Sequence, residues 1–221
     1  LPSLRVLKLA SGESLQYAVD VPHDDAVVAW YLQGAGNSWS DRAATALTAQ
    51  IIKSGFFQQL RTEQQLGYIV SAFSWPRLDV PGVVLLIQSP NTSAAGVAQA
   101  MELFMRGVEG DLDEAQFLRH RTALVKEIMR PDKNLWERAE FYWQSIAKKQ
   151  FDFGGRQALA DAVEALTLAD WLDYFNSVFI EQGHSLQVVS PGARGELPPV
   201  DTAPLRSADE IKSGHDSYLV H

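Results

Sequence analysis

An arginine and a tyrosine flank one short loop and are the side chains of this sequence best suited to polar recognition. Arg61 carries a planar cationic fork, and Tyr68 carries a phenol hydroxyl where the chain enters a strand through Gly67. Judged by residue chemistry alone, a solvated arginine beside a half-buried tyrosine is the favoured explanation of the pair, because both residues are common beside helix-to-strand turns. Both interpretations of residues 56–68 stay open at this point.

The sequence offers little support for metal chemistry. None of its five histidines lies three or four residues from another along the chain. They are His23, His120, His184, His215 and His221. His120 and Glu127 would share one helix face, but they supply two of the three ligands that a catalytic zinc requires. Cysteine is absent, which removes thiolate metal sites, disulfides and thiol nucleophiles. We therefore expect no metal ligand and no catalytic residue in this chain.

Composition limits the class of protein and its partners. Apolar residues make up 46% and charged residues 21% of the 221 residues, so the chain can bury a sizeable core. The net charge of −8 disfavours a nucleic-acid partner, which would need a positive face. Apolar runs such as Val83–Ile87 are far shorter than the roughly 20 residues that span a membrane. The chain starts at Leu1 without a methionine or a signal pattern, and we expect it to be a piece of a longer protein.

Hydrophobic patterning predicts the elements that position Arg61 and Tyr68. Apolar runs between residues 5 and 34 predict three adjacent strands. The next apolar stripe predicts a helix capped by Ser40 or Asp41, and a further short helical turn leads to Arg61. Two later apolar runs, joined by a loop rich in proline and glycine, predict a hairpin that starts at Tyr68. Arg61 and Tyr68 are thus expected where a helix ends and a hairpin begins.

The second half of the chain is predicted to be mainly helical. Several apolar stripes follow one another at helical spacing, and Thr167 with Asp170 form a capping box ahead of another helix. Trp136, Trp143 and Trp171 lie on or near these stripes, which favours packing in the core. A last short strand follows the helices. This order of elements indicates the α+β class, with a layer of helices against one mostly antiparallel sheet.

One domain is favoured over two. We expect a single domain over residues 1–190 and a linker and tail over residues 191–221, because proline and glycine are frequent just after residue 190.

The segment 60–70 reads Leu-Arg-Thr-Glu-Gln-Gln-Leu-Gly-Tyr-Ile-Val. It strongly resembles the C-terminal part of the pitrilysin and insulin-degrading enzyme (insulinase) family of inverted-motif zinc metallopeptidases. Gln88-Ser89, Leu135-Trp136-Glu137 and Phe151-Asp152-Phe153 continue the likeness, which covers most of residues 4–190. The resemblance implies a metalloprotease fold of the LuxS/MPP-like type. It also implies four homologous domains around a chamber, with this chain as the fourth, non-catalytic one.

The resemblance assigns the zinc to another domain. In the family, the metal lies on an inverted His-x-x-Glu-His motif with a further glutamate downstream. The comparable helix here has no histidine over residues 41–47. The chain itself is therefore expected to carry no cofactor, and zinc belongs to the parent enzyme.

The resemblance also implies roles for three residues. Arg61 and Tyr68 match family residues that reach across the chamber toward the substrate, and Phe57 matches a residue of the pocket for the side chain beside the scissile bond. A guanidinium and a phenol hydroxyl can donate to a substrate carbonyl or to the oxyanion that develops from it. Arg61, Tyr68 and Phe57 are accordingly the predicted substrate-binding residues.

The expected partners are the N-terminal catalytic half of the same enzyme and peptide substrates, with neither nucleic acid nor membrane. Self-association through the face of Phe57 and Tyr68 is also expected, because that face would be uncovered in a fragment. Two alternatives stay open: a zinc-free subunit of a two-chain peptidase, and a structural scaffold like the core proteins of respiratory complexes. A reading frame of about four such domains would favour the C-terminal domain of a single-chain enzyme. A reading frame of about two would favour the zinc-free subunit.

The resemblance to pitrilysin implies a bacterial, periplasmic protein. A cofactor-biosynthesis peptidase of the same family would instead be cytoplasmic, and the absence of cysteine is compatible with both.

Overall fold

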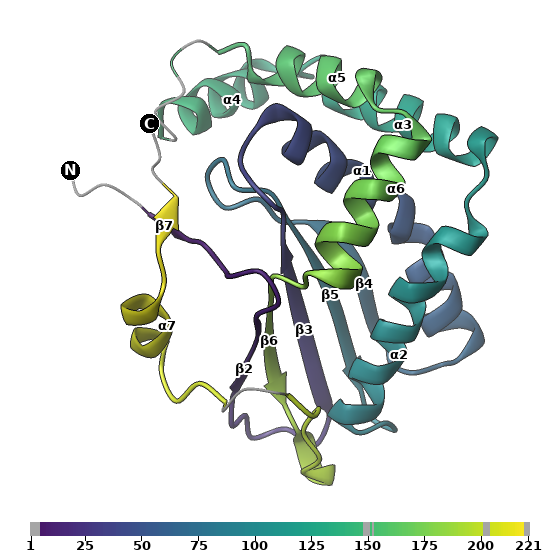
Figure 1. Cartoon of the computed structure of the whole chain (residues 1–221), viewed down its shortest axis with the longest axis vertical. Coiled ribbons are helices and arrows are strands. Elements are labelled where there is room, and N and C mark those ends of the chain that lie inside the picture. The colour runs from purple at the N-terminus through teal and green to yellow at the C-terminus, as the bar shows by residue number, and fades with distance from the viewer. Residues whose placement is uncertain (1–4, 148–150, 152, 201–203, 219–221) are drawn as a thin grey trace.

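A computed structural model describes residues 5–147, 151, 153–200 and 204–218. It contains a five-stranded sheet with helices packed on it (Figure 1). From edge to edge the strands are β2 (Ser14–Ala18), β6 (Ser185–Ser190), β3 (Ala26–Gln33), β5 (Gly82–Ser89) and β4 (Ile69–Ser74). β2 and β6 are parallel, and all other neighbours are antiparallel. The predicted α+β class with a mostly antiparallel sheet is confirmed, and so is the hairpin of β4 and β5.

The three strands predicted in the first part of the chain are present, but the prediction that they are adjacent is wrong. β6 lies between β2 and β3, and β1 (Val6–Leu7) pairs with β7 (Ser217–Tyr218) outside the main sheet. Alternating apolar residues identify a strand without identifying its neighbour. The connection from β2 to β3 runs over residues 19–25 and is much longer than a two-residue hairpin turn. This length leaves room for β6 to enter from the end of the helical half.

The helices form two layers. α1 and α2 pack directly on the sheet, and α3, α5 and α6 pack on α1 or on one another (Figure 1). The helices are α1 (Trp39–Phe56), α2 (Ala94–Gly107), α3 (Glu114–Ile128), α4 (Leu135–Ala147), α5 (Gly155–Ala165), α6 (Leu168–Phe175) and α7 (Ala208–Gly214). Shorter turns are the π-helices η1 (Phe57–Glu63) and η3 (Asn176–Glu181) and the 3-10 helices η2 (Val108–Asp111) and η4 (Gly192–Arg194). None of the helices in the described residues is both long and apolar enough to cross a membrane.

Helix caps follow the sequence closely, with one correction. Ser38, and not Ser40 or Asp41, caps α1: its hydroxyl accepts from the Asp41 backbone N–H at 3.2 Å, and the Asp41 carboxylate accepts from the Ser38 backbone N–H. A capping box places its acid three residues after the cap, so Asp41 is the third helical residue. The predicted box of Thr167 and Asp170 ahead of α6 is confirmed.

Trp171 lies in the core, and the two tryptophans of α4 do not. Trp171 is fully buried, its indole N–H donates to the Thr48 hydroxyl at 3.0 Å, and its ring stacks on Phe175. Trp136 and Trp143 are 78% and 64% exposed, so the prediction that they pack in the core is wrong. An apolar stripe defines one face of a helix but does not say which surface covers it.

The segment after residue 190 stays close to the body of the protein. The side-chain amide of Gln16 donates to the Pro198 carbonyl at 3.0 Å, and the Leu205 N–H donates to the Gln16 carbonyl at 2.8 Å. Leu205 therefore lies against the free edge of β2, ahead of α7 and β7, which are yellow in Figure 1. Residues 201–203 and 219–221, like Asp152, lie outside the described residues. The predicted domain boundary at residue 190 stays a prediction.

Candidate functional site

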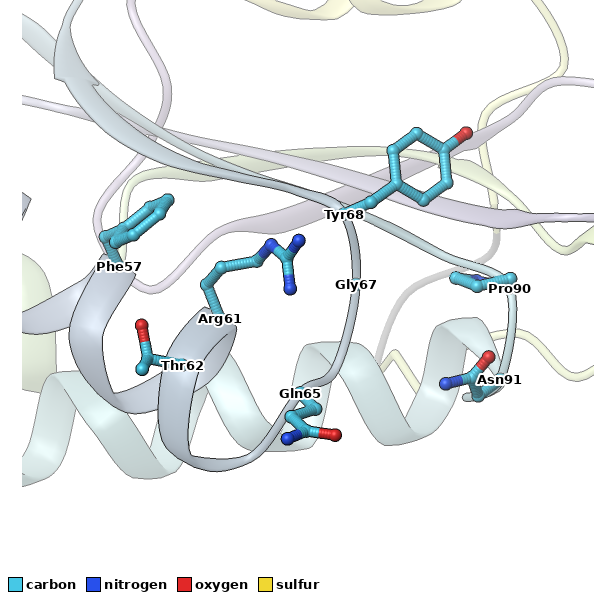
Figure 2. Close-up of a pocket in the computed structure, with 8 residues that line it drawn as sticks. All are labelled: Phe57, Arg61, Thr62, Gln65, Gly67, Tyr68, Pro90 and Asn91. Carbon is cyan, nitrogen blue, oxygen red and sulfur yellow. The ribbon is translucent and has the colours of Figure 1, made fainter.

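One pocket of about 490 Å³ gathers the three residues that the sequence singled out. Its lining residues are Phe57, Arg61, Thr62, Gln65, Gly67, Tyr68, Pro90 and Asn91 (Figure 2). They come from η1, from the turn between η1 and β4, and from the loop after β5. The structure thus brings Phe57, Arg61 and Tyr68 together, and their binding of substrate stays a prediction.

Helix α1 continues directly into the π-helix η1, which replaces the short helical turn expected before Arg61. π-helical turns are rare and are found frequently at functional sites. Leu60 is fully buried beneath η1, whereas Phe57 is 50% exposed and Arg61 is partly exposed. Because Leu60 anchors this turn in the core, Phe57 and Arg61, four residues apart, both face the pocket.

Two backbone features direct the chain from η1 into β4. Gln65 has a φ of 52°, in the left-handed region, which costs a non-glycine residue about 1–2 kcal/mol. Gly67 lies so close to β5 that a Cβ atom would collide with the carbonyl oxygen of Gln88. Only glycine fits this approach, and it places Tyr68 at the start of β4.

Tyr68 is held by an acidic residue from another strand. Its hydroxyl donates to Oδ2 of Asp25 at 2.7 Å, and Nε2 of Gln88 donates to the same oxygen at 3.1 Å. Asp25, which is only 8% exposed, comes just before β3, while Gln88 lies near the end of β5. The three side chains therefore form a row across the ends of β4, β5 and β3.

Electrostatics couples the members of this row. The hydrogen bond from Tyr68 lowers the pKa of Asp25; burial opposes this effect, and Gln88 and His23 add to it. The same hydrogen bond raises the pKa of Tyr68, as expected for a hydroxyl that gives its proton to a carboxylate. Tyr68 therefore stays protonated, and Asp25 stays ionised, over a wide range of pH.

The side chain of Arg61 has neither a hydrogen bond nor an ion pair with any residue that the structure describes. Its guanidinium extends from η1 toward the strand segment at Gly67, as Figure 2 shows. In the same view the Tyr68 ring leaves the chain beyond Gly67, and its hydroxyl points away from Arg61. The guanidinium can therefore bind a carbonyl or carboxylate group without breaking a contact to a described residue.

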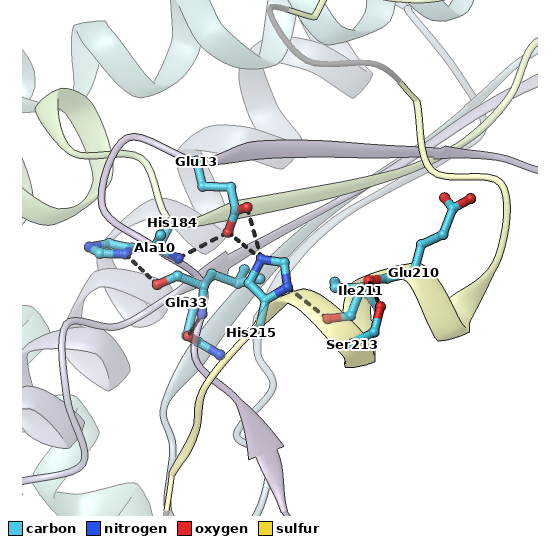
Figure 3. A network of polar contacts seen from close by, with 9 residues as sticks. Ala10, Glu13, Gln33, His184, Glu210, Ile211, Ser213 and His215 are labelled. Atoms are coloured by element: carbon cyan, nitrogen blue, oxygen red, sulfur yellow. Dashed lines mark hydrogen bonds and ion pairs between the residues drawn. The ribbon is translucent and has the colours of Figure 1, made fainter.

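A metal site is not found in the described part of the chain. No three histidine, aspartate or glutamate side chains among those residues are placed to hold an ion, and α1 contains no histidine. His184 contacts the Leu9 carbonyl through Nδ1, and His215 contacts Glu13 through Nε2 (Figure 3). His221 lies outside the described residues. The predicted absence of a bound metal stays a prediction.

Sequence reasoning missed Asp25 and Gln88 as members of the site. Asp25 lies 43 residues before Tyr68, in a loop without any recognisable motif. The register pairs Val27 with Gln88 and Gln88 with Ile69, so the three strand ends meet only once the order β3-β5-β4 is known. The polar pair Gln88-Ser89 at the end of an apolar strand was the only available signal.

Comparisons with known proteins point to one family. Residues 47–143 match a family described as PQQ synthase PqqF-like, C-terminal lobe domain 4. The peroxisomal insulin-degrading enzyme-like 1 of Arabidopsis thaliana is 29% identical over 178 residues, which are 78% of this chain and 18% of that protein. Protease 3 of Escherichia coli strain K12 is 24% identical over 161 residues, which are 72% of this chain and 17% of that protein.

Solved structures have the same fold. A crystal structure of pitrilysin superposes with a TM-score of 0.86 at 19% identity, over 99% of this chain and 24% of pitrilysin. A peptidase M16 inactive domain from Pseudomonas fluorescens superposes with a TM-score of 0.60 at 15% identity, over 89% of this chain and 46% of that one.

The sheet, the helical layers and the element order give this chain a pitrilysin-like α+β fold. The family match, the curated relatives and the pitrilysin structure all support the C-terminal part of the pitrilysin and insulin-degrading enzyme family for this chain. The chain spans less than a fifth of the curated relatives named above. The activity, substrates and partners of a whole relative are therefore proposals for this chain.

Proposed function

We propose that this chain is the non-catalytic C-terminal domain of a pitrilysin-like zinc metalloendopeptidase, and that the pocket of Phe57, Arg61 and Tyr68 binds the peptide beside the bond to be cleaved. The observation that carries the proposal is the meeting of these three residues in one pocket. They are the residues that the family resemblance singles out, and they include an exposed aromatic ring, a cation and a hydroxyl.

Each side chain has a chemical task in this proposal. The half-exposed ring of Phe57 offers an apolar surface to a substrate side chain. Arg61 donates to a peptide carbonyl oxygen and strengthens that bond as negative charge develops on the oxygen. Tyr68 adds a second donor to the same group. Preorganised donors of this kind contribute about 3 kcal/mol each to the stabilisation of a transition state.

The metal in this proposal belongs to another domain. The described residues do not offer the three ligands that a catalytic zinc needs, so they do not fit this ion. The relatives are several times longer than this chain, which supports a partner half within the same enzyme. Self-association through the exposed Phe57 and Tyr68 is a further proposal, which light scattering of the isolated chain would test.

We propose a class of substrate and a cellular compartment for the whole enzyme. Some relatives are named for degrading insulin, and the matching family is named for PQQ synthase, so the proposed substrates are peptides, either general or the precursor of a cofactor. The periplasm, with the cytoplasm as the alternative, is proposed from the family resemblance alone.

The test replaces Arg61 in the full-length enzyme. Arg61→Lys keeps the charge but loses the planar fork, so kcat/KM for labelled insulin B chain should fall by roughly ten-fold or more. Arg119→Lys, an exposed arginine of α3, is the matched control and should keep full activity. Zinc content should not change in either variant. Equal activity of Arg61→Lys and wild type would contradict the proposal.

A second test uses the 221-residue chain alone. We expect it to bind no stoichiometric zinc and to hydrolyse no peptide, as measured by metal analysis and by a fluorogenic peptide assay. One tightly bound zinc per chain, together with cleavage that a chelator stops, would refute the non-catalytic assignment.

A further inference from the structure

We propose that Asp25 is a positioning residue that holds Tyr68 in a resting orientation, from which the tyrosine must be released before its hydroxyl can donate to a bound peptide. The inference rests on the proposed function, because it takes Tyr68 to be a donor to substrate. The hydrogen-bonded row of Tyr68, Asp25 and Gln88 carries it.

The single proton of the Tyr68 hydroxyl limits what this side chain can bind. A tyrosine hydroxyl has a single proton to donate. In this structure that proton goes to Oδ2 of Asp25 at 2.7 Å. While this bond persists, the hydroxyl oxygen of Tyr68 can accept a hydrogen bond, but it cannot donate one to a carbonyl or an oxyanion. A ligand must therefore compete with the carboxylate of Asp25.

The Tyr68 side chain is turned away from the other donor of the pocket. The Tyr68 hydroxyl points away from Arg61, although both residues line one pocket (Figure 2). Asp25 is 8% exposed, and its backbone N–H donates to Nδ1 of His23 at 3.0 Å, so Asp25 is fixed in place. The Tyr68 side chain is 49% exposed and has room to rotate. Rotation of Tyr68 is thus the movement that turns both donors toward one ligand.

The strength of the contact between Tyr68 and Asp25 can be changed from both of its sides. A hydrogen bond to an ionised acceptor is roughly twice as strong as a neutral one. Asp25→Asn keeps the shape but makes the acceptor neutral, and should release Tyr68. Gln88 donates to the same Asp25 oxygen and so competes with Tyr68 for the charge of this carboxylate. Gln88→Met removes this competing donor and should bind the Tyr68 proton more tightly.

The two substitutions should therefore have opposite effects in the full-length enzyme. With labelled insulin B chain as the probe, we expect kcat/KM to rise on the order of five-fold in Asp25→Asn. We expect it to fall in Gln88→Met. Asp24→Asn is the matched control: it removes a neighbouring charge that is exposed and has no side-chain hydrogen bond with a described residue, so activity should not change.

A double-mutant cycle separates this inference from the proposed function. In a Tyr68→Phe background both effects should vanish, because no hydroxyl remains to be released. Suppose that Tyr68→Phe loses activity. If Asp25→Asn then brings no gain when Tyr68 is present, or brings the same gain in the Tyr68→Phe background, the inference alone is overturned. If Tyr68→Phe loses no activity, the role proposed for Tyr68 fails, and the inference fails with it.

A readout without catalysis tests the resting orientation itself. In the 221-residue chain with labelled tyrosine rings, NMR titration should give Tyr68 a pKa above that of a free tyrosine. Asp25→Asn should return this pKa toward the ordinary value, and Asp24→Asn should leave it raised. Thermal unfolding of each variant checks that it is folded. A Tyr68 that titrates normally in the wild-type chain would overturn the inference.

Discussion

Arg61 and Tyr68 reach one pocket from different elements, and in the described structure only Tyr68 already has a partner. A guanidinium without a partner binds a ligand at little cost, whereas the tyrosine must exchange one acceptor for another. This difference makes Tyr68 the more informative residue to change.

Tyr68→Phe removes one hydroxyl and keeps the ring. Folding should survive, because the ring is half exposed and the lost hydrogen bond lies at the strand ends, outside the ladder of the sheet. In the full-length enzyme kcat/KM should fall by roughly 10²-fold, the lower end for the loss of one oxyanion donor. Steady-state kinetics with parallel metal analysis measure this, and zinc content should stay constant. Unchanged activity would leave Tyr68 with a structural role only.

Phe57, Arg61 and Tyr68 could be singled out from the sequence because the motif that holds them is local and specific. Asp25 could not, since it contributes through a contact between strands that are distant along the chain. The left-handed backbone of Gln65 was equally invisible, because glutamine is not a residue that signals such a turn. The sequence thus identifies the residues of a local motif, whereas the orientation of their side chains depends on tertiary structure.

At the scale of elements, the close approach of the η1–β4 turn to β5 depends on Gly67. A Cβ atom there would collide with the Gln88 backbone, so Gly67→Ala must displace β4 or β5. We expect a loss of stability of about 1–3 kcal/mol, typical of overpacking. Gly110→Ala is the control, because its Cβ would meet no neighbouring atom. Urea unfolding measures both, and equal stability of the two variants would contradict the account of Gly67.

The C-terminal elements α7 and β7 are joined to the body by a histidine contact. Nε2 of His215 lies 2.8 Å from the Glu13 carboxylate, and Nδ1 lies 2.7 Å from the Ile211 carbonyl oxygen (Figure 3). Both partners are acceptors, so the doubly protonated ring fits best. The hydrogen bond with Glu13 raises the pKa of His215; burial opposes this, and the Ile211 carbonyl supports it.

A raised pKa in the folded state sets the sign of the pH dependence. The stabilisation from His215 is fully present below the unfolded pKa of about 6.5 and is lost as pH rises through the folded value. We expect the β1–β7 pair and the bond from the Lys8 N–H to the Asp216 carbonyl to open more readily at high pH. Hydrogen exchange, corrected for its intrinsic pH dependence, measures this. His215→Gln should abolish this pH dependence of hydrogen exchange. The other titratable groups that line the same pocket, Lys8, His184 and Asp216, are still present in this control variant.

At the scale of the whole molecule, the order of elements was predictable and the order of strands was not. Apolar periodicity located the long helix, the hairpin and the helical half, because each depends on neighbouring residues. The insertion of β6 between β2 and β3 depends on a contact between the two ends of the chain. For the same reason the stripes of α4 and α6 look alike in sequence, although their tryptophans lie in different environments.

This difference between tryptophans predicts two very different effects on global stability. Trp171 is fully buried, stacks on Phe175 and donates to Thr48, so Trp171→Ala should cost about 3–5 kcal/mol. Trp136 is 78% exposed, and Trp136→Ala should change the free energy of unfolding by no more than about 0.5 kcal/mol. Chemical unfolding followed by circular dichroism measures both in the isolated chain. A large loss of stability in Trp136→Ala would contradict the exposed position of this side chain on α4.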